Sequence, residues 1–244
     1  MRLLIPCMKC LQELGRPDEW FGRVEFRDDG CYEVVCRRGH CTVTVLQEEK
    51  YEILFEIGVN AILDGCYREA VASFAASLER FYQFSIFVLL EEQKVERDQA
   101  LLSWKLVASQ SERQLGAFIF LWLSRFQKAP SVLNGKAVEF RNEVVHKGKI
   151  PSKEEALHFG DNVLAIIQPK LLRLRAALKE SMQNCIFYTI RERSQQAQIE
   201  SQVSTMSVRT AFQPAERQSV LPMTVAEYLA QVKQARDVVL APGV

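Results

Sequence analysis

Histidine is scarce in this chain of 244 residues, which contains only His40, His146 and His158. Imidazole is the side chain that titrates closest to pH 7, so acid–base chemistry at neutral pH depends on very few positions. Glycine-rich phosphate-binding loops and Ser-His-Asp signatures are absent too. Their absence disfavours P-loop nucleotide hydrolysis and serine hydrolase chemistry.

Long apolar runs and an excess of one charge are also missing. The most apolar internal run, 115–123, is too short to span a bilayer, and the apolar start 3–5 is interrupted by Pro6 before it reaches signal length. We therefore expect a soluble, cytoplasmic protein with no membrane partner. Lys plus Arg is 31 against 30 for Asp plus Glu, and the net charge of +1 disfavours a nonspecific polyanion binder.

The hydrophobic fraction of 48% is enough for a proper core. Residues 1–47 form short alternating runs around the turn signal Asp28-Asp29-Gly30, a pattern typical of strands. From about residue 50 the apolar residues recur at helical spacing, with a long aromatic helix over 67–92. We predict a mainly α fold, with a helical bundle over 48–195 preceded by a small β ribbon over 1–47.

Local signals place the later helices. Two helices are expected over 97–126 with a break near 109–111, and a short helix is expected over 132–147. Ser152-Lys153-Glu154-Glu155 has the form of a capping box, so a long helix should begin at Ser152. Pro169 should kink or break that helix.

The C-terminal part has a different composition. Residues 196–222 are rich in Gln, Ser and Thr and favour a linker or a loosely packed strap. A second capping box at Thr224 opens an amphipathic helix over 223–240. The apolar face of that helix needs a partner surface, in its own chain or in another.

Cysteines crowd into the N-terminal region. Cys7 and Cys10 are separated by two residues, so both thiolates can face one ion from a tight turn. A second pair of ligands is expected about 20 to 30 residues later. Cys36 and His40 fit that spacing, and Gly39 permits the sharp turn between them.

Two other cysteines compete for the site. Cys31 lies five residues before Cys36, so strand alternation points it to the opposite face. Cys41 can replace His40 and is the second choice. We therefore predict a structural zinc ion held by Cys7, Cys10, Cys36 and His40, since four protein ligands leave no open position for catalysis. Clustered cysteines of this kind suit a reducing compartment.

His146 closes the segment Arg141-Asn142-Glu143-Val144-Val145-His146. On a helix Arg141 falls near the middle of an apolar arc, where a guanidinium needs a carboxylate such as Glu79, an interface or a bound phosphate. Asn142 and His146 are i and i+4, so the amide can orient the imidazole. Arg141 and His146 lie about 140° apart around the helix, so a shared site would need two copies across a two-fold axis.

This Arg-x4-His pattern, with a polar residue after the arginine and on a late helix of a small bundle, resembles the HEPN superfamily. The resemblance covers roughly residues 50–190, and the long aromatic helix and the capped helix after Ser152 match its layout. It implies a metal-independent endoribonuclease with its site at a homodimer interface. His146 would then be the general acid/base on a ribose 2′-hydroxyl, Arg141 would stabilise charge on the phosphate, and Asn142 would fill the polar position.

The same resemblance implies RNA as the substrate. It also implies a role as a toxin or an anti-phage defence effector, with an antitoxin or a defence-system protein as a further partner. The β ribbon would then recognise RNA or a partner, and its basic residues would contact phosphates or simply form a solvated face. These residues are Arg16, Arg23, Arg27, Arg37 and Arg38.

Other interpretations stay open. His146 can be a helix C-terminal residue that favours the helix dipole, with Arg141 in a structural ion pair. The chain would then be a non-catalytic HEPN-like nucleotide- or nucleic-acid-binding or scaffolding protein with a structural zinc. A DNA-reading transcription regulator is disfavoured, because a helix-turn-helix signal is lacking. His158 is expected to be a lone polar residue on its helix.

Overall fold

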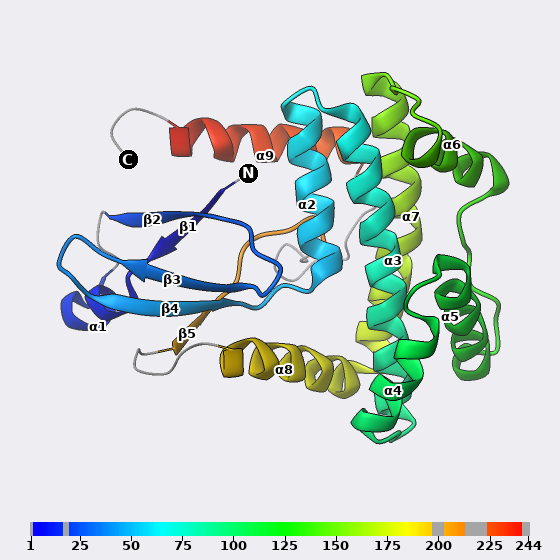
Figure 1. Ribbon diagram of the computed structural model, residues 1–244, viewed down its shortest axis with the longest axis horizontal. Coiled ribbons are helices and arrows are strands. Elements are labelled where there is room, and N and C mark those ends of the chain that lie inside the picture. Colours follow the sequence, from blue (N-terminus) through cyan, green and yellow to red (C-terminus); the bar gives the residue numbers. More distant parts are fainter. Residues whose placement is uncertain (1, 17–19, 197–202, 213–223, 241–244) are drawn as a thin grey trace. The chain divides into compact units, whose positions relative to one another are not determined.

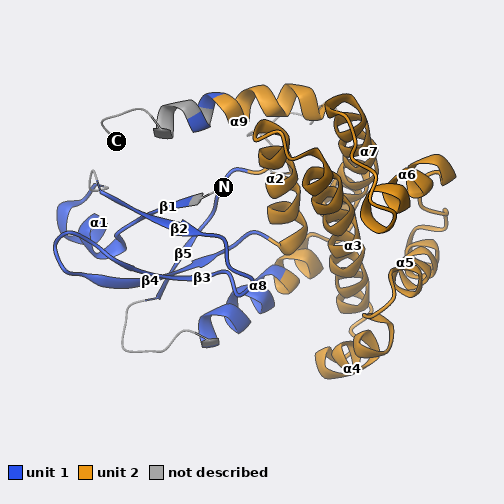
Figure 2. Cartoon of the chain, turned by 45° about the horizontal axis from the view of Figure 1, so that its top comes forward, with its two compact units in different colours: residues 1–48, 186–209, 234–244 blue, residues 49–185, 210–233 orange. Residues whose placement is uncertain are grey.

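The computed structural model describes residues 2–16, 20–196, 203–212 and 224–240 (Figure 1). The fold is mainly α with a small N-terminal β region, as predicted. The chain forms two compact units, each assembled from separate stretches of the sequence (Figure 2). The first unit comprises Met1–Glu48, Ile186–Arg209 and Gln234–Val244, and the second comprises Glu49–Cys185 and Thr210–Lys233.

The described strands belong to the first unit and form two small sheets. In the first sheet β1 pairs antiparallel with β2, and in the second β3 pairs antiparallel with β4 while β5 joins the other edge of β4 in parallel. The strand bounds are β1 Arg2–Pro6, β2 Phe21–Glu25, β3 Cys31–Val35, β4 Cys41–Leu46 and β5 Val203–Met206.

β5 lies inside the segment 196–222, which the sequence predicts as a linker or strap; part of that segment is outside the described residues. Contacts beyond the strand ladder hold it. The Glu48 carboxylate accepts hydrogen bonds from Ser207 Oγ at 2.6 Å and from the Val208 amide at 2.8 Å. A Gln- and Ser-rich sequence has no strand periodicity, so this strand depends on the open edge of β4, far away in the sequence.

Arg193, which belongs to the first unit, hydrogen-bonds to the end of β4 and to a residue just after it. From helix α8 (Lys179–Gln196) its guanidinium donates to the backbone carbonyl oxygens of Leu46 and Glu48. The Arg193 side chain also lies against Gly30, which is in the predicted turn and has φ +62°. A Cβ atom at Gly30 would lie 3.0 Å from Arg193 Nε. The turn therefore needs glycine both for its backbone conformation and for this close approach.

The second unit is a helical bundle with α3 at its centre. α3 packs against α2, α4, α5, α6 and α7, as its wide aromatic stripe predicts. The ring of Phe74 lies against Gly58 and Gly160, where a Cβ would approach it to 2.6 Å and 2.8 Å. The helix bounds are α2 Lys50–Leu63, α3 Tyr67–Glu92, α4 Arg97–Val107, α5 Ser111–Phe126, α6 Gly135–His146, α7 Lys153–Ala177 and α9 Val225–Leu240, α9 belonging to this unit as far as Lys233.

The start of α7 confirms the capping prediction, and its length shows that the helix does not end at Pro169. Ser152 is the N-cap, and its hydroxyl and the Glu155 carboxylate exchange the two hydrogen bonds of a capping box. The helix continues through Pro169, so the break that the sequence allowed there does not occur, and the kink stays a prediction. Pro169 and Ala165 are both exposed, so the carbonyl that proline leaves without an N–H partner is open to water.

The final helix finds its partner surface in the second unit of its own chain. Thr224 and Glu227 form the predicted capping box, and Val225 and Tyr228 are buried. The Tyr228 hydroxyl donates to the Glu56 carboxylate at 2.8 Å, as does the Ala211 amide at 2.9 Å. Burial raises the pKa of Glu56 to about 7, although these two hydrogen bonds act in the opposite direction.

We expect the variant Glu56→Gln to be more stable than the wild type above pH 7, by on the order of 2 kcal/mol. The folded pKa of about 7 lies above the ordinary 4.5, so between these values the folded state binds more protons and stability falls as pH rises. Glutamine keeps an acceptor oxygen without the charge. Urea unfolding at pH 5 and pH 8 measures the difference, with the exposed Glu139→Gln as control. A gain that does not grow with pH would contradict the expected cost of the buried charge.

Candidate functional site

The N-terminal cysteine pair lies at the start of a helix. α1 (Met8–Leu14) begins directly after β1, with Cys7 as its N-cap. The Cys7 thiol accepts a hydrogen bond from the Cys10 amide at 3.5 Å, which places both sulfurs on one side of the first turn. The predicted tight-turn knuckle is therefore a helical turn, because a thiol can cap a helix in the same position as a serine hydroxyl.

The second pair comes from the turn between β3 and β4. Cys36 follows β3 and His40 precedes β4, and the Cys36 amide donates to the His40 carbonyl oxygen at 3.0 Å. Gly39 between them has φ +78°, as the predicted sharp turn requires. The hairpin thus brings the second thiol and the imidazole to the same place.

The structure brings together the four residues that the sequence ranks first. Their ligand atoms all lie within 4.8 Å of one another, and the three cysteines are buried. We call Cys7, Cys10, Cys36 and His40 the Cys3His cluster. Cys41, the second choice, is exposed and donates to the Glu33 carboxylate instead. Cys31 is half-buried and takes no part, as strand alternation predicts.

The spacing of the ligand atoms suits a tetrahedral ion. The Cys10 and Cys36 sulfurs are 3.8 Å apart, and His40 Nδ1 lies 3.4 Å from the Cys10 sulfur and 3.8 Å from the Cys7 sulfur. A tetrahedron with Zn–S bonds of about 2.3 Å and a Zn–N bond of about 2.1 Å has edges of roughly 3.6 to 3.8 Å. The Cys3His cluster can therefore hold a metal ion such as zinc.

Burial and crowding act on the thiols of the Cys3His cluster. Burial raises the pKa of Cys10 to about 12, and the neighbouring Cys7 and Cys36 add to this shift. For Cys36 burial also acts upward, but hydrogen bonds from the His40 and Arg38 amides, together with those from the Cys7 and Cys10 thiols, lower its pKa. Several thiolates this close together need a cation, which is the role that a divalent metal fills.

A second layer of side chains orients the imidazole. His40 turns Nδ1 toward the sulfurs and Nε2 toward the Glu13 carboxylate, 3.6 Å away. Arg38 bridges the same carboxylate, at 2.9 Å, and the Cys10 sulfur, at 3.9 Å. A carboxylate behind a ligating histidine fixes its tautomer and raises its basicity, and a cation beside a thiolate offsets its charge.

We expect Glu13→Gln to weaken metal binding by about tenfold, because the amide is a poorer acceptor for the ligating imidazole. Competition with a chromogenic chelator measures the affinity. Glu25→Gln, at an exposed position on β2, is the matched control. Equal affinities for the two variants would show that Glu13 does not support His40.

The Arg-x4-His segment lies on α6. Asn134 caps this helix by accepting from the Ala137 amide at 2.9 Å, and Phe140 packs on Phe159 of α7 with ring centroids 5.8 Å apart. The connection before α6 is held from α7, where Lys170 donates to Ser131 Oγ at 2.8 Å. Burial lowers the pKa of Lys170 to about 8. α6 is therefore fixed at its start and along one face.

Arg141 is half-buried on α6. In the described ranges its guanidinium makes no hydrogen bond or ion pair, and the predicted partner Glu79 does not reach it. The arc around it is only partly covered, because Val138 and Val145 are half-exposed while Val144 is buried. The guanidinium therefore reaches solvent, which removes the need for an internal carboxylate.

Asn142 and His146 share one side of α6, as their spacing predicts. Asn142 is half-buried and His146 is exposed at the helix C-terminus. Neither side chain hydrogen-bonds to the other or to any other residue that the structure describes. All three predicted residues are accessible, and a single copy of α6 does not converge them on one point.

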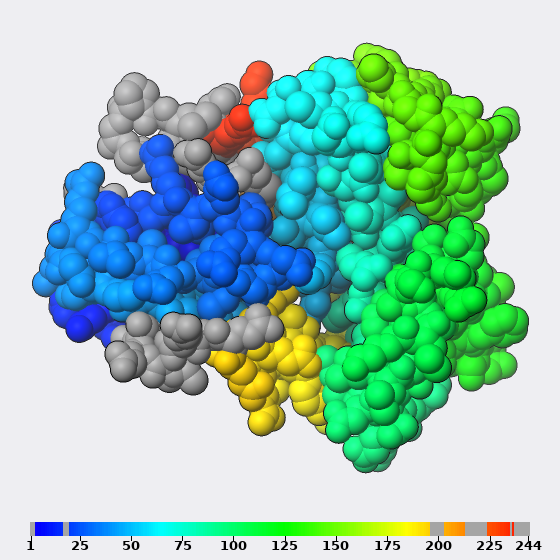
Figure 3. Space-filling view, viewed as in Figure 1, coloured from blue at the N-terminus to red at the C-terminus, as the bar shows by residue number. Residues whose placement is uncertain are grey.

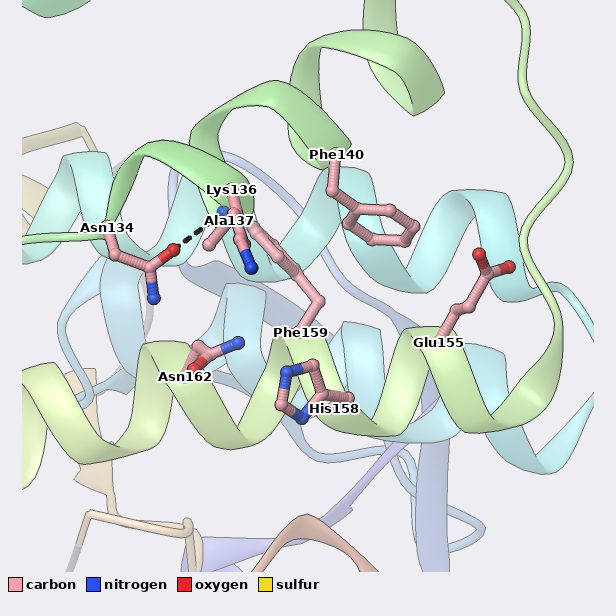
Figure 4. A pocket seen from close by; sticks show the side chains of 8 residues that line it. All are labelled: Asn134, Lys136, Ala137, Phe140, Glu155, His158, Phe159 and Asn162. Carbon is pink, nitrogen blue, oxygen red and sulfur yellow. Dashed lines mark hydrogen bonds between the residues drawn. The ribbon is translucent and has the colours of Figure 1, made fainter.

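His158 has surroundings that the sequence does not reveal. It lines a cavity between α6 and α7 together with Lys136 and Asn162 (Figure 4). His158 and Asn162 are i and i+4 on α7, whereas Lys136 comes from α6, so only the packing of α6 on α7 joins all three.

Comparison with protein families, curated proteins and solved structures found no match to this chain. In the ranges that the structure describes, no helix combines the length and the apolar character needed to cross a bilayer.

Proposed function

We propose that this chain is a metal-independent endoribonuclease of HEPN type that acts as a homodimer. One observation carries the proposal: α6 presents a half-buried guanidinium and an exposed imidazole five residues apart, and no described residue engages either group. A guanidinium without an internal counter-charge is well placed to bind a phosphate. An exposed imidazole can exchange protons near pH 7.

The reaction follows from these two groups. His146 takes the proton from a ribose 2′-hydroxyl, whose oxygen attacks the adjacent phosphorus while the bond to the 5′-oxygen breaks. Arg141 stabilises the added negative charge on the phosphate, and Asn142 positions the imidazole or the substrate. The leaving 5′-oxygen takes a proton from water and His146 returns its proton to the solvent, which yields a 5′-hydroxyl and a 2′,3′-cyclic phosphate.

A second copy of the chain would complete the site. Arg141 and His146 diverge by about 140° around α6, so a two-fold axis near α6 is the simplest way to join one of each. The second unit also exposes large apolar side chains that a dimer would cover (α4 and α5 are green in Figure 3). Their exposures are Leu106 74%, Phe120 72%, Leu102 54% and, just after the motif, Ile150 83%.

The Cys3His cluster would hold a structural zinc ion. Four protein ligands leave no position for water or substrate, so zinc would stabilise the β region rather than cleave RNA. The β region would then recognise RNA or a partner protein, such as an antitoxin or another component of a defence system. Arg37 is exposed for such contacts, whereas Arg27 and Arg38 are engaged by Asp29 and Glu13.

Incubation of the purified chain with total RNA, without added Mg²⁺ and with enough EDTA to bind free metal, tests the proposal. Zinc content is measured in parallel, so that loss of the structural ion is not mistaken for loss of a catalyst. Cleavage should continue and leave termini that resist phosphatase until the cyclic phosphate is opened. Light scattering should give the mass of a dimer, and a monomer that cleaves RNA would contradict the composite site.

A non-catalytic function is the second candidate, and one observation favours it. No residue in the described part of the chain orients the His146 imidazole, whereas a general base is usually held by a hydrogen bond. The chain would then bind nucleotides or nucleic acid, or join a larger complex, with zinc as a structural ion. RNA binding without cleavage under any metal condition would support this alternative.

A further inference from the structure

A cavity of about 320 Å³ lies between α6 and α7 within the second unit (Figure 4). Its volume falls in the range of small-molecule sites, which is about 300 to 1,000 Å³. Phe140 of α6 lies about 160° around the helix from Asn142 and about 120° from His146. The cavity is therefore on a different side of α6 from Asn142 and His146.

The cavity has an apolar wall and a polar rim. Ala137, Phe140 and Phe159 form the wall. Figure 4 shows Lys136 of α6 facing His158 and Asn162 of α7 across the space. An apolar wall with a few converging polar groups is the usual make-up of a site for a small organic molecule.

The polar groups of the rim are not used by the fold. The side chains of Lys136, His158 and Asn162 make no hydrogen bond or ion pair within the described ranges. The Asn134 side-chain oxygen is occupied by the Ala137 amide, but no described group takes its amide nitrogen. The rim therefore offers an ammonium, an imidazole and amide groups to a ligand.

The charge of the rim is positive. Glu155 is the acidic residue of the lining, and its carboxylate already accepts the Ser152 amide at 2.8 Å and pairs with Lys149 at 2.9 Å. The Ser152 amide and Lys149 hold the pKa of Glu155 below its usual value. Lys136 has no such counter-charge, and the N-terminal end of α6 beside it adds partial positive charge.

We propose that this cavity binds a small organic anion. A ring-sized apolar part would lie against Phe140 and Ala137, and a carboxylate or phosphate would contact Lys136 and the amide groups of Asn134 and Asn162. Glu155 of the lining is paired with Lys149, whose ammonium lies 4.8 Å from the centre of the Phe140 ring. This site goes beyond RNA cleavage and does not depend on it.

Calorimetry and NMR titration of the full chain with four probes test the proposal. Phenyl phosphate and benzoate carry both the ring and the anion, inorganic phosphate lacks the ring, and benzylamine reverses the charge. The two aromatic anions should bind, and the tighter of them identifies the preferred head group. Inorganic phosphate should bind more weakly, and benzylamine should not bind.

Two variants place the binding in the cavity. Lys136→Gln should weaken both aromatic anions by about tenfold, because a charge-assisted contact is lost. Asn162→Leu should abolish binding by filling the cavity while the melting temperature is kept. Lys128→Gln, an exposed lysine outside the lining, is the matched control and should bind like the wild type.

The failures of the two proposals can be told apart. The anion site is overturned if neither aromatic anion shows saturable binding. It is also overturned if benzylamine binds as tightly as benzoate, or if Lys136→Gln and Lys128→Gln weaken anion binding equally. His146→Ala should retain binding of the aromatic anions in full. Loss of RNA cleavage together with intact anion binding therefore bears on His146 alone.

Discussion

Replacing His146 with alanine is expected to lower EDTA-resistant RNA cleavage by about 10²- to 10⁴-fold, the usual contribution of a general acid–base group. Imidazole is the side chain that most often acts as a general acid or base in enzymes. The His146 imidazole is exposed, so its removal should leave the melting temperature unchanged. Single-turnover cleavage of a fluorescent RNA measures the effect without interference from product release.

Controls on the same helix separate chemistry from folding. Glu139→Ala removes an exposed side chain two turns before His146 and should cleave at the wild-type rate. Arg141→Ala should lose cleavage as His146→Ala does, because the phosphate charge is no longer stabilised. Wild-type cleavage by both the Arg141 and the His146 variants would show that α6 is not the active element.

The substitution Cys10→Ser is expected to abolish tight metal binding and to lower the zinc content from about one ion per chain to almost none. Cys10 is fully buried in the Cys3His cluster, and its sulfur lies closest to the His40 imidazole among the measured pairs. Serine leaves a buried hydroxyl that is a poor zinc ligand. Elemental analysis measures the metal, and limited proteolysis should show faster cleavage within residues 1–48.

Cys41→Ser is the matched control, because the spacing of the cysteines in the sequence also allows Cys41 as the fourth metal ligand. It is exposed and lies outside the Cys3His cluster, so the variant should keep its metal and its protease resistance. If both serine variants lose zinc equally, then Cys41 takes part in binding and the ligand set needs revision. If neither loses zinc, the metal is bound elsewhere.

The parts of the fold that were predicted from sequence depend on local chemistry. The capping box at Ser152 and the turn at Gly39 are each defined by a few adjacent residues, so their backbone geometry can be inferred without knowledge of the rest. The long helix over 67–92 follows from its own periodicity. The spacing of Cys7, Cys10, Cys36 and His40 likewise predicts their grouping.

The parts that were missed depend on contacts between distant residues. β5 has no periodicity of its own and exists through the edge of β4. The cavity beside Lys136 and His158 arises where two helices meet, so it cannot be predicted from the sequence pattern of either helix alone. α7 continues through Pro169 because that position faces water, and burial of this kind cannot be read from the proline itself.

Lys149 gives the second unit a point at which covalent modification could act. Its ammonium bridges the Glu143 and Glu155 carboxylates at 3.4 Å and 2.9 Å and covers the Phe140 ring. Acetylation would remove the charge, and the two acids would be left facing each other without their shared cation. One acyl group would thereby disturb both the loop that follows His146 and the wall of the cavity between α6 and α7.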